Sequence, residues 1–550
     1  MFDSNLNPKQ RANDLSRLGR EHFDVLVLGG GINGVGVALD AITRGLTVAL
    51  IESDDFAAGT SSRSSKLIHG GLRYLEQYDF KLVREALHER ELMVSALAPH
   101  LVKPVAFLYP LQEKVKERTY VGAGLALYDA LRGFKRALPG HKHLSQKTIS
   151  EIAPSLRTDV ITGAIRYFDA QVDDARHTMM IARTAKRHGA VIVTRASVDS
   201  LIKKNRRVTG AVVIDSYSKK KINVKASTVI MCAGVWSDEL HKKFGIEPGY
   251  EVKMSKGVHI TLPGDAIKAD EGVIIKTAVS VLFIIPWKNQ WMIGTTDTEY
   301  LGDPNAPLAD RSDVQYIIDQ ANRVLNPRIN IDQVIGVFAG LRPLVANKKA
   351  SDTTKLSREH TVDRPLPGFV SLAGGKYTTY RVMAKDAVDM ATNDITKLTN
   401  ESVTAKLPII GADGYFALAQ QAEALASKYN LKLETINHLL NRYGSDISDI
   451  LELIEDDRKL ASPFTRDLPY LKAEIIYSVI SEGAQSVCDV LERRTRIWFE
   501  AENFGEDLAP AVADLIAPLL GWKAAQKKQS VATYLTKVEA AKKSAANLSH

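Results

Sequence analysis

The feature that most constrains the fold is the run Gly29-Gly30-Gly31-Ile32-Asn33-Gly34, which satisfies the pattern G-x-G-x-x-G. It follows an apolar run at 24–28 and opens a helix-like segment at 35–44. A second apolar run at 46–51 then ends beside Glu52, at about the 20-residue spacing expected of a βαβ unit that binds a dinucleotide. We therefore predict an α/β fold built on a Rossmann unit.

Each glycine of this turn has a separate predicted task. Gly29 allows the tight turn, Gly31 lets a pyrophosphate approach the backbone, and Gly34 lets helix and strand pack closely. The helix N-terminus supplies N–H groups to the phosphates. Glu52 would accept hydrogen bonds from the adenosine ribose and repel a 2′-phosphate, which disfavours NADP. The alternative is a glycine-rich turn in a protein that binds no nucleotide.

The choice between NAD and FAD depends on the rest of the sheet. Short alternating runs at 190–232 predict a strand, a small β-meander and a last buried strand that ends near Gly234. A further glycine turn, Gly374-Gly375, precedes a helix near residue 378. A Rossmann sheet interrupted in this way favours FAD.

The pattern along the chain divides it into three parts. We predict a FAD-binding domain from residues 20–100, 150–240 and 335–395, interleaved with an antiparallel-sheet substrate domain from 100–150 and 241–334. A polar linker at 396–414 leads to a helical C-terminal domain at 415–550. Overall we expect a glutathione-reductase-like α/β domain within an α+β chain.

Composition excludes several classes of protein. The 550 residues include two cysteines, Cys232 and Cys488, which exclude a disulfide scaffold and a CxxC site, and we predict no metal. No apolar run reaches the length of about 18 residues that a membrane span needs. The N-terminus lacks a secretory pattern, so we expect a cytoplasmic protein. A net charge of +8 leaves nucleic acid, anionic lipid and phosphorylated substrates open.

Several longer motifs, in this order, resemble the FAD-dependent (aerobic, respiratory) glycerol-3-phosphate dehydrogenases. They are GGGING, TSSRSSKLIHGGLRYLE, VDDAR (172–176), KGVHI (256–260), PW (286–287), IGTTDTEY (293–300), GLRPL (340–344), GGKYTTYR (374–381) and, more loosely, LERRTRIWF (491–499). The resemblance implies oxidation of sn-glycerol 3-phosphate to dihydroxyacetone phosphate by hydride transfer from C2 to FAD. It also implies electron transfer to a membrane quinone, ubiquinone or menaquinone.

The chain departs from this family at two motifs. Cys232 stands where relatives often have alanine, in a segment that relatives often read as Ala-Thr-Gly, and Tyr377 stands where they often have leucine. An insertion typical of the oxidase branch is absent from the sequence, which favours the quinone-linked enzyme. The alternatives are an oxidase that makes hydrogen peroxide and a basic flavoprotein that binds RNA. Against the last, the sequence shows no basic patch interleaved with aromatic residues.

Motif positions assign residues to two ligands. Those expected to bind FAD are Gly29, Gly31, Asn33, Gly34, Glu52, Thr60, Ser61, Ser62, Ser65, Lys66, Leu67, His69, Val198, Gly234, Trp236, Gly340, Gly375, Lys376 and Thr378. Those expected to bind substrate are Arg73, Tyr74, Arg342, Lys376 and Arg358, because arginine pairs with two phosphate oxygens at once.

The catalytic base is left open between three residues. His69 and His259 carry side chains that titrate near neutrality, and Lys376 follows a glycine turn. Arg342 completes the catalytic set as an electrostatic group. A quinone-linked enzyme must reach the inner face of the cytoplasmic membrane as a peripheral protein, and residues 118–136 have the amphipathic, basic pattern for this. The alternative for that segment is burial at a domain or homodimer interface.

Overall fold

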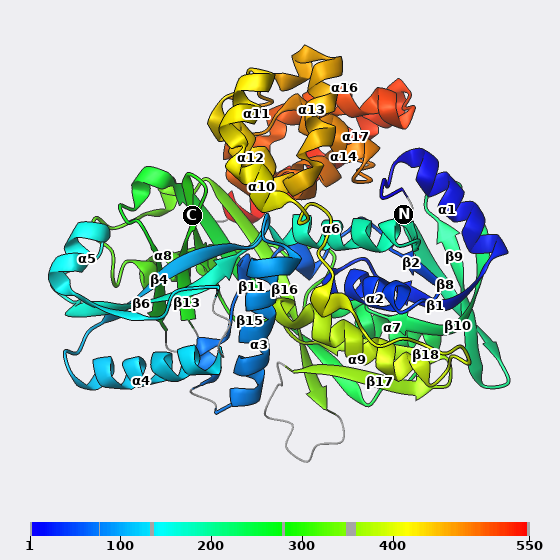
Figure 1. Ribbon diagram of the computed structural model, residues 1–550, viewed down its shortest axis with the longest axis horizontal. Helices are drawn as coiled ribbons and strands as arrows, with labels where there is room; N and C mark the ends of the chain where they lie inside the picture. The colour runs from blue at the N-terminus through cyan, green and yellow to red at the C-terminus, as the bar shows by residue number, and fades with distance from the viewer. Residues whose placement is uncertain (1–2, 76–77, 133–136, 278–280, 348–358, 547–550) are drawn as a thin grey trace.

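The computed structural model describes residues 3–75, 78–132, 137–277, 281–347 and 359–546. Two sheets lie side by side, and a group of C-terminal helices lies above the junction between them (Figure 1). The predicted α/β core, the antiparallel sheet and the helical C-terminal region are confirmed.

The first sheet contains the Rossmann unit. Its order is β17-β18-β10-β1-β2-β7, with β8 and β9 attached to β10, and β1 runs parallel to both β2 and β10. Apolar side chains on both faces of β1 are fully buried, as expected of a strand covered on two sides. Its strands are β1 (His22–Leu28), β2 (Val48–Ile51), β7 (Val191–Val193), β8 (Ala196–Lys204), β9 (Arg207–Asp215), β10 (Lys221–Met231), β17 (His360–Leu366) and β18 (Phe369–Gly374).

Helices cover this sheet and fix the glycine turn. The helix α2 begins at Ile32, directly after the turn, and contacts both α6 and α9. On the other face, α1 contacts β7 and β10 through buried Leu18. The helices of this part are α1 (Pro8–Arg20), α2 (Ile32–Thr43), α6 (Asp174–Arg187), α7 (Ser237–Phe244) and α9 (Tyr380–Thr392).

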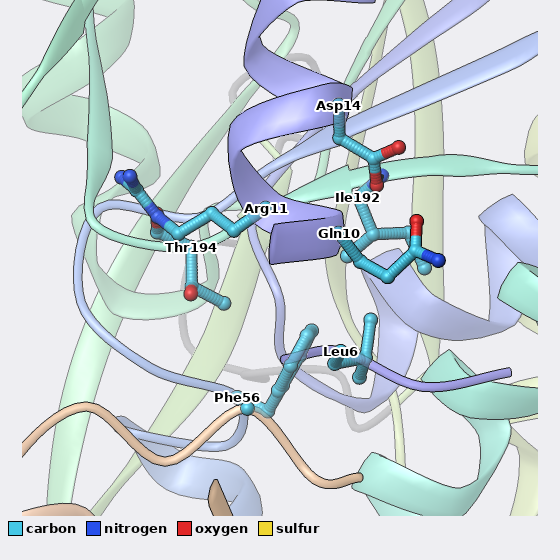
Figure 2. A pocket seen from close by; sticks show the side chains of 8 residues that line it. Leu6, Gln10, Arg11, Asp14, Phe56, Ile192 and Thr194 are labelled. Carbon is cyan, nitrogen blue, oxygen red and sulfur yellow. The ribbon is translucent and has the colours of Figure 1, made fainter. Parts of the chain in front are cut away.

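A water-sized cavity lies beside α1 and is lined by Leu6, Asp14 and Ile192 among others (Figure 2). The guanidinium of Arg11 donates to the carbonyl oxygen of Thr194 at 2.9–3.0 Å. These contacts attach the N-terminal helix to the end of β7.

The second sheet is largely antiparallel and carries the order β15-β11-β14-β13-β12-β4-β6-β3, with β16 paired to β11 and β5 to β6. Its strands are β3 (Leu67–Ile68), β4 (Lys103–Leu111), β5 (Lys142–Ser145), β6 (Gly163–Gln171), β11 (Tyr250–Pro263), β12 (Gly272–Lys276), β13 (Val281–Trp287), β14 (Gln290–Gly294), β15 (Thr298–Glu299) and β16 (Gly336–Asn347). Its helices are α3 (Phe80–Leu92), α4 (Lys116–Leu131), α5 (Gln146–Ile152) and α8 (Arg311–Ala321).

This topology corrects the predicted domain boundaries. The strands β3, β6 and β16 belong to the second sheet, although the sequence assigned their residues to the FAD domain. The reason is pairing: β16 aligns with β11 over its whole length, and β6 aligns with all of β4. The second sheet therefore begins at the residues that directly follow the Rossmann unit.

The C-terminal helices do not form a separate core. Ile436, Leu439 and Tyr477 belong to the same buried cluster as Val25 and Ile32 of the Rossmann unit. Ile409 and Ile410 of the predicted linker are buried in it as well. The helices are α10 (Tyr415–Gln420), α11 (Ala422–Tyr429), α12 (Leu433–Tyr443), α13 (Ile447–Asp456), α14 (Lys472–Ile480), α15 (Ile497–Glu500), α16 (Ala509–Leu520) and α17 (Ala524–Ala546).

Across the described ranges, no helix has the length and apolar character needed to cross a membrane. The helix α4 packs its Leu125 and Tyr128 against the second sheet, so the predicted apolar stripe partly faces inward. Tyr120 and Leu127 lie on its exposed side, at 64% and 39% exposure. Phe134, at the end of the predicted segment, lies outside the described residues.

Candidate active site

A cavity of about 820 Å³ runs between the two sheets, and its size is within the range of cofactor sites. Most of the residues predicted from the sequence line it. They are Gly29, Gly31, Asn33, Glu52, Thr60, Ser61, Ser65, Leu67, His69, Tyr74, Val198, Gly234, Trp236, His259, Gly340, Arg342, Gly375, Lys376 and Thr378.

The glycine turn forms one end of this cavity. A Cβ on Gly34 would lie 1.9 Å from the carbonyl oxygen of Gly29, so only glycine allows the helix to start this close to the strand. Gly31 caps α2 without a side-chain hydrogen bond, and the next N–H, of Ile32, donates to Ser61 Oγ at 2.9 Å. The start of α2 therefore points its N–H groups at the cavity, as a phosphate site requires.

Glu52 closes the same end. Its carboxylate accepts from the N–H groups of Gly30 at 2.6 Å and Asp54 at 2.7 Å. Burial, the main cause, raises the pKa of Glu52, while these two hydrogen bonds oppose the rise. The carboxylate is thus held at the end of β2, next to the glycine turn, where the predicted ribose contact needs it.

Three predicted cofactor residues do not line the cavity. Gly34 lies beneath the turn, in its predicted packing role. The carbonyl oxygen of Ser62 accepts from Lys66 Nζ at 3.1 Å, and that ammonium also pairs with Asp174 at 3.1 Å. The Lys66 side chain is fully buried against the ring of Phe338, so the prediction that it runs beside the flavin needs correction. Burial, followed by the charge of Arg496, lowers its pKa to about 8.

Two predicted phosphate ligands lie beyond what can be described. Arg358 lies outside the described residues, and Arg73 lies in the short helix Leu72–Tyr74 with a side chain that is not described.

His69 sits at the junction of the two ends, with its ring partly exposed to the cavity. Its Nδ1 lies 2.7 Å from Oδ2 of the fully buried Asp169. Its backbone is fixed by Thr378, whose hydroxyl accepts from the His69 N–H at 3.1 Å and donates to its carbonyl oxygen at 3.2 Å. With Nδ1 engaged, Nε2 is the nitrogen that can exchange a proton with a ligand.

Asp169 is itself held by several donors. Arg90 Nη1 donates to it at 2.6 Å, the Tyr128 hydroxyl at 2.8 Å and the Gly70 N–H at 3.1 Å. Burial alone would raise the pKa of Asp169, but His69 and Arg90 hold it below its usual range. Asp169 is therefore an ionised carboxylate that orients the imidazole and stabilises its protonated form.

His259 occupies a different environment. Its Nε2 lies 2.9 Å from Ser65 Oγ, and its ring stacks on Phe338 at 4.8 Å between centroids. Burial, with the charges of Lys66 and Arg342, lowers its pKa well below 6.5. His259 is thus a neutral ring in the cavity wall, which disfavours it as a base.

Cationic groups gather near His69. Arg342, on β16, donates to Thr295 Oγ1 at 3.0 Å and keeps 28% of its side chain exposed. Lys376 Nζ lies 3.4 Å from the centre of the Tyr74 ring. Two cations and a phenol beside a part-exposed histidine can bind a small phosphate ester and move a proton from it.

Sequence analysis missed Asp169, Arg90 and Tyr128, because they come from three segments that pair only in the fold. A weak signal exists: Asp169 interrupts the apolar pattern of β6, and a carboxylate at a buried strand position is uncommon unless paired.

The cavity fits a dinucleotide at one end and a small anion at the other, and comparisons with known proteins agree. Residues 24–383 match the family described as FAD dependent oxidoreductase. Residues 402–527 match the C-terminal domain of alpha-glycerophosphate oxidase.

The relatives carry one activity in their names. The chain is 48% identical to glycerol-3-phosphate dehydrogenase 2 of Mycobacterium bovis, over 97% of this chain and 91% of that protein. It is 34% identical to the mitochondrial glycerol-3-phosphate dehydrogenase of Mus musculus, over 96% of this chain and 74% of that protein. The glycerol-3-phosphate dehydrogenase of Bacillus halodurans, solved with FAD, superposes with a TM-score of 0.79 at 28% identity and covers 98% of both chains.

Proposed function

The chain belongs to the FAD-dependent glycerol-3-phosphate dehydrogenases, and from this membership we propose that it oxidises C2 of sn-glycerol 3-phosphate to dihydroxyacetone phosphate and passes the electrons to a membrane quinone. The observation that carries the proposal is the His69–Asp169 pair, which lies in one cavity with a dinucleotide turn and a cationic end. FAD, when bound, supplies the acceptor for the C2 hydride.

The phosphate of the substrate is expected at the cationic end. Arg342 offers a planar fork that pairs with two oxygens, and Lys376 offers a second positive charge beside it in the same cavity. Tyr74 contributes a phenol, and Arg73 stays a candidate from its sequence position. This arrangement would hold the phosphate away from the dinucleotide end and leave C2 near the middle of the cavity.

The C2 hydroxyl must lose a proton as the hydride leaves. His69 is our proposed base, because Asp169 fixes Nδ1 and leaves Nε2 to accept the proton. The ionised carboxylate then stabilises the imidazolium that forms. His259 would serve as a neutral wall residue, and Lys376 as an electrostatic partner rather than the base.

The residues that would hold FAD divide by end. Gly29, Gly31 and the start of α2 would face the pyrophosphate, and Glu52 the ribose. Gly375 and Thr378 begin the segment before α9, at the opposite end of the same cavity. The remaining cavity-lining residues predicted from sequence are expected to contact the cofactor along its length.

The test is anaerobic mixing of the holoenzyme with sn-glycerol 3-phosphate while flavin absorbance is followed. Bleaching at a rate that saturates with substrate, and formation of dihydroxyacetone phosphate in equal amount, is the expected result. An unchanged flavin spectrum would refute the proposed reaction. The enantiomeric phosphate ester serves as the control for specific binding.

The acceptor is a separate step of the proposal. A quinone lies in the bilayer, so the enzyme would bind the inner face of the cytoplasmic membrane peripherally, with exposed Tyr120 and Leu127 of α4 as candidate contacts. We expect reduction of a soluble quinone analogue to outpace oxygen consumption, and flotation with anionic vesicles to weaken in a variant with both residues changed to serine. Peroxide production at the rate of flavin reduction would favour an oxidase instead.

A further inference from the structure

A cluster of buried charges joins the C-terminal region to the loop after β2. Each of its carboxylates has a basic partner there: Asp54 pairs with Arg195, Asp55 with Arg493 and Arg494 at 2.7 Å each, Asp489 with Arg195 at 2.5 Å, and Glu492 with Lys537 at 2.9 Å. The cluster borders the large cavity, because Asp54, Arg493 and Lys537 all line it.

Arg63 is the cation of this neighbourhood that the carboxylates leave over. It lines the same cavity, and no hydrogen bond or ion pair joins its guanidinium to another residue of the described ranges. Burial, followed in effect by the charge of Arg493, lowers its pKa, although Glu492 and Asp54 oppose the shift. Because an arginine stays protonated in proteins, this charge needs an anion that the protein itself does not supply.

The position of Arg63 indicates which anion. Its N–H donates to the carbonyl oxygen of Thr60 at 3.0 Å, which closes the short helix Thr60–Ser62. Ser61 of that helix contacts the first N–H of α2 at 2.9 Å. Gly340 gives Arg63 room, since a Cβ there would lie 2.3 Å from its carbonyl oxygen. Arg63 therefore extends from the segment that touches the phosphate-binding end of α2.

We propose that Arg63, assisted by Arg493 and Lys537 of the C-terminal region, binds the pyrophosphate of FAD. The helix N-terminus would neutralise one side of the diphosphate through N–H groups, and the guanidinium the other side. The C-terminal region is then part of the cofactor site, because it supplies two of the three cations on this wall.

The experiment measures release of FAD from the holoenzyme by the rise of flavin fluorescence after dilution, for wild type, Arg63→Gln, Arg63→Lys and Lys537→Gln. One lost charge-assisted contact predicts release about 10- to 100-fold faster for Arg63→Gln. Arg63→Lys should recover part of the loss, and Lys537→Gln should show a smaller effect in the same direction. Exposed Arg206, on the β8–β9 hairpin, gives the matched control Arg206→Gln, which removes the same charge away from the cavity.

Two outcomes would overturn the proposal. One is release at the wild-type rate in Arg63→Gln and Lys537→Gln alike. The other is a raised dissociation constant for glycerol 3-phosphate with unchanged FAD release, which would assign Arg63 to the substrate phosphate. A fall in thermal stability of Arg63→Gln is checked against Lys537→Gln, whose partner Glu492 keeps a second contact to Arg493 at 3.0 Å.

Discussion

Replacing Asp169 with asparagine tests the catalytic assignment directly, because the change keeps the shape and removes the charge. In the wild type the carboxylate lies 2.7 Å from His69 Nδ1 and receives Arg90 at 2.6 Å. A hydrogen bond to a charged group is worth about 1.5–3 kcal/mol, which is roughly a 10- to 150-fold loss in rate if it is made to the imidazolium. An amide can also hold the wrong tautomer, and in serine proteases the equivalent change costs about 10⁴-fold.

The assay is stopped-flow reduction of the flavin by sn-glycerol 3-phosphate under anaerobic conditions, between pH 6 and 9. We expect Asp169→Asn to lower the limiting rate at least about tenfold. Its dissociation constant for substrate should change little, because Asp169 lies behind His69 and does not line the cavity. The acidic limb of the rate profile should move to lower pH, since the lost carboxylate no longer favours the protonated ring.

A second pair of variants separates orientation from general damage to the core. Tyr128 donates to Asp169 at 2.8 Å, whereas the buried hydroxyl of Tyr167 has no hydrogen-bond partner among the described residues. The two rings contact each other edge to face at 6.4 Å between centroids. Tyr128→Phe should slow flavin reduction by about 2- to 10-fold, and Tyr167→Phe should not. Equal rates in both variants, or a wild-type rate in a folded Asp169→Asn that retains FAD, would refute the role given to this carboxylate.

Three further changes probe other parts of the molecule. Arg342→Ala should raise the KM for glycerol 3-phosphate by about 10- to 100-fold with FAD still bound, and loss of FAD would show that its role is misassigned. Gly34→Ala should abolish FAD occupancy, because its Cβ would lie 1.9 Å from the Gly29 carbonyl oxygen, while Gly124→Ala, with open space around it, should leave the flavin spectrum unchanged. Burial, above all, lowers the pKa of His100 from 6.5 to about 3, so the unfolded chain binds the extra proton and stability is lost as pH falls below 6.5; urea unfolding of His100→Asn should depend less on pH in that range.

The parts of the fold that the sequence predicted are those fixed by local sterics. The turn at 29–34 admits only glycine at its closest contacts, and this requirement is visible in four letters of sequence. The segment that follows β2 was also divided correctly between two ends of one cavity, with Ser61 at the dinucleotide end and His69 at the junction. Such features need no knowledge of distant residues.

The failures concern groups whose surroundings come from far along the chain. Lys66 was expected at the flavin, but its backbone adopts φ +56° and its ammonium turns inward to Asp174, which is 108 positions away. The partner of His69 is 100 positions away and reaches it through the pairing of β3 with β6. Strand register of this kind is set by tertiary contacts, so a single sequence does not show it.

The boundary predicted before residue 415 failed for a related reason. A helical segment after a polar linker is typical of an independent domain, yet Arg493 and Arg494 reach Asp55 across 438 and 439 positions. Removing one partner of a buried pair costs about 3–5 kcal/mol, because a desolvated charge stays behind. The C-terminal region therefore holds the loop after β2 more by the penalty for leaving than by a gain on arrival. The loop it holds leads directly into Thr60–Ser62, so the same contacts that merge the two regions also fix the segment from which Arg63 extends into the cavity.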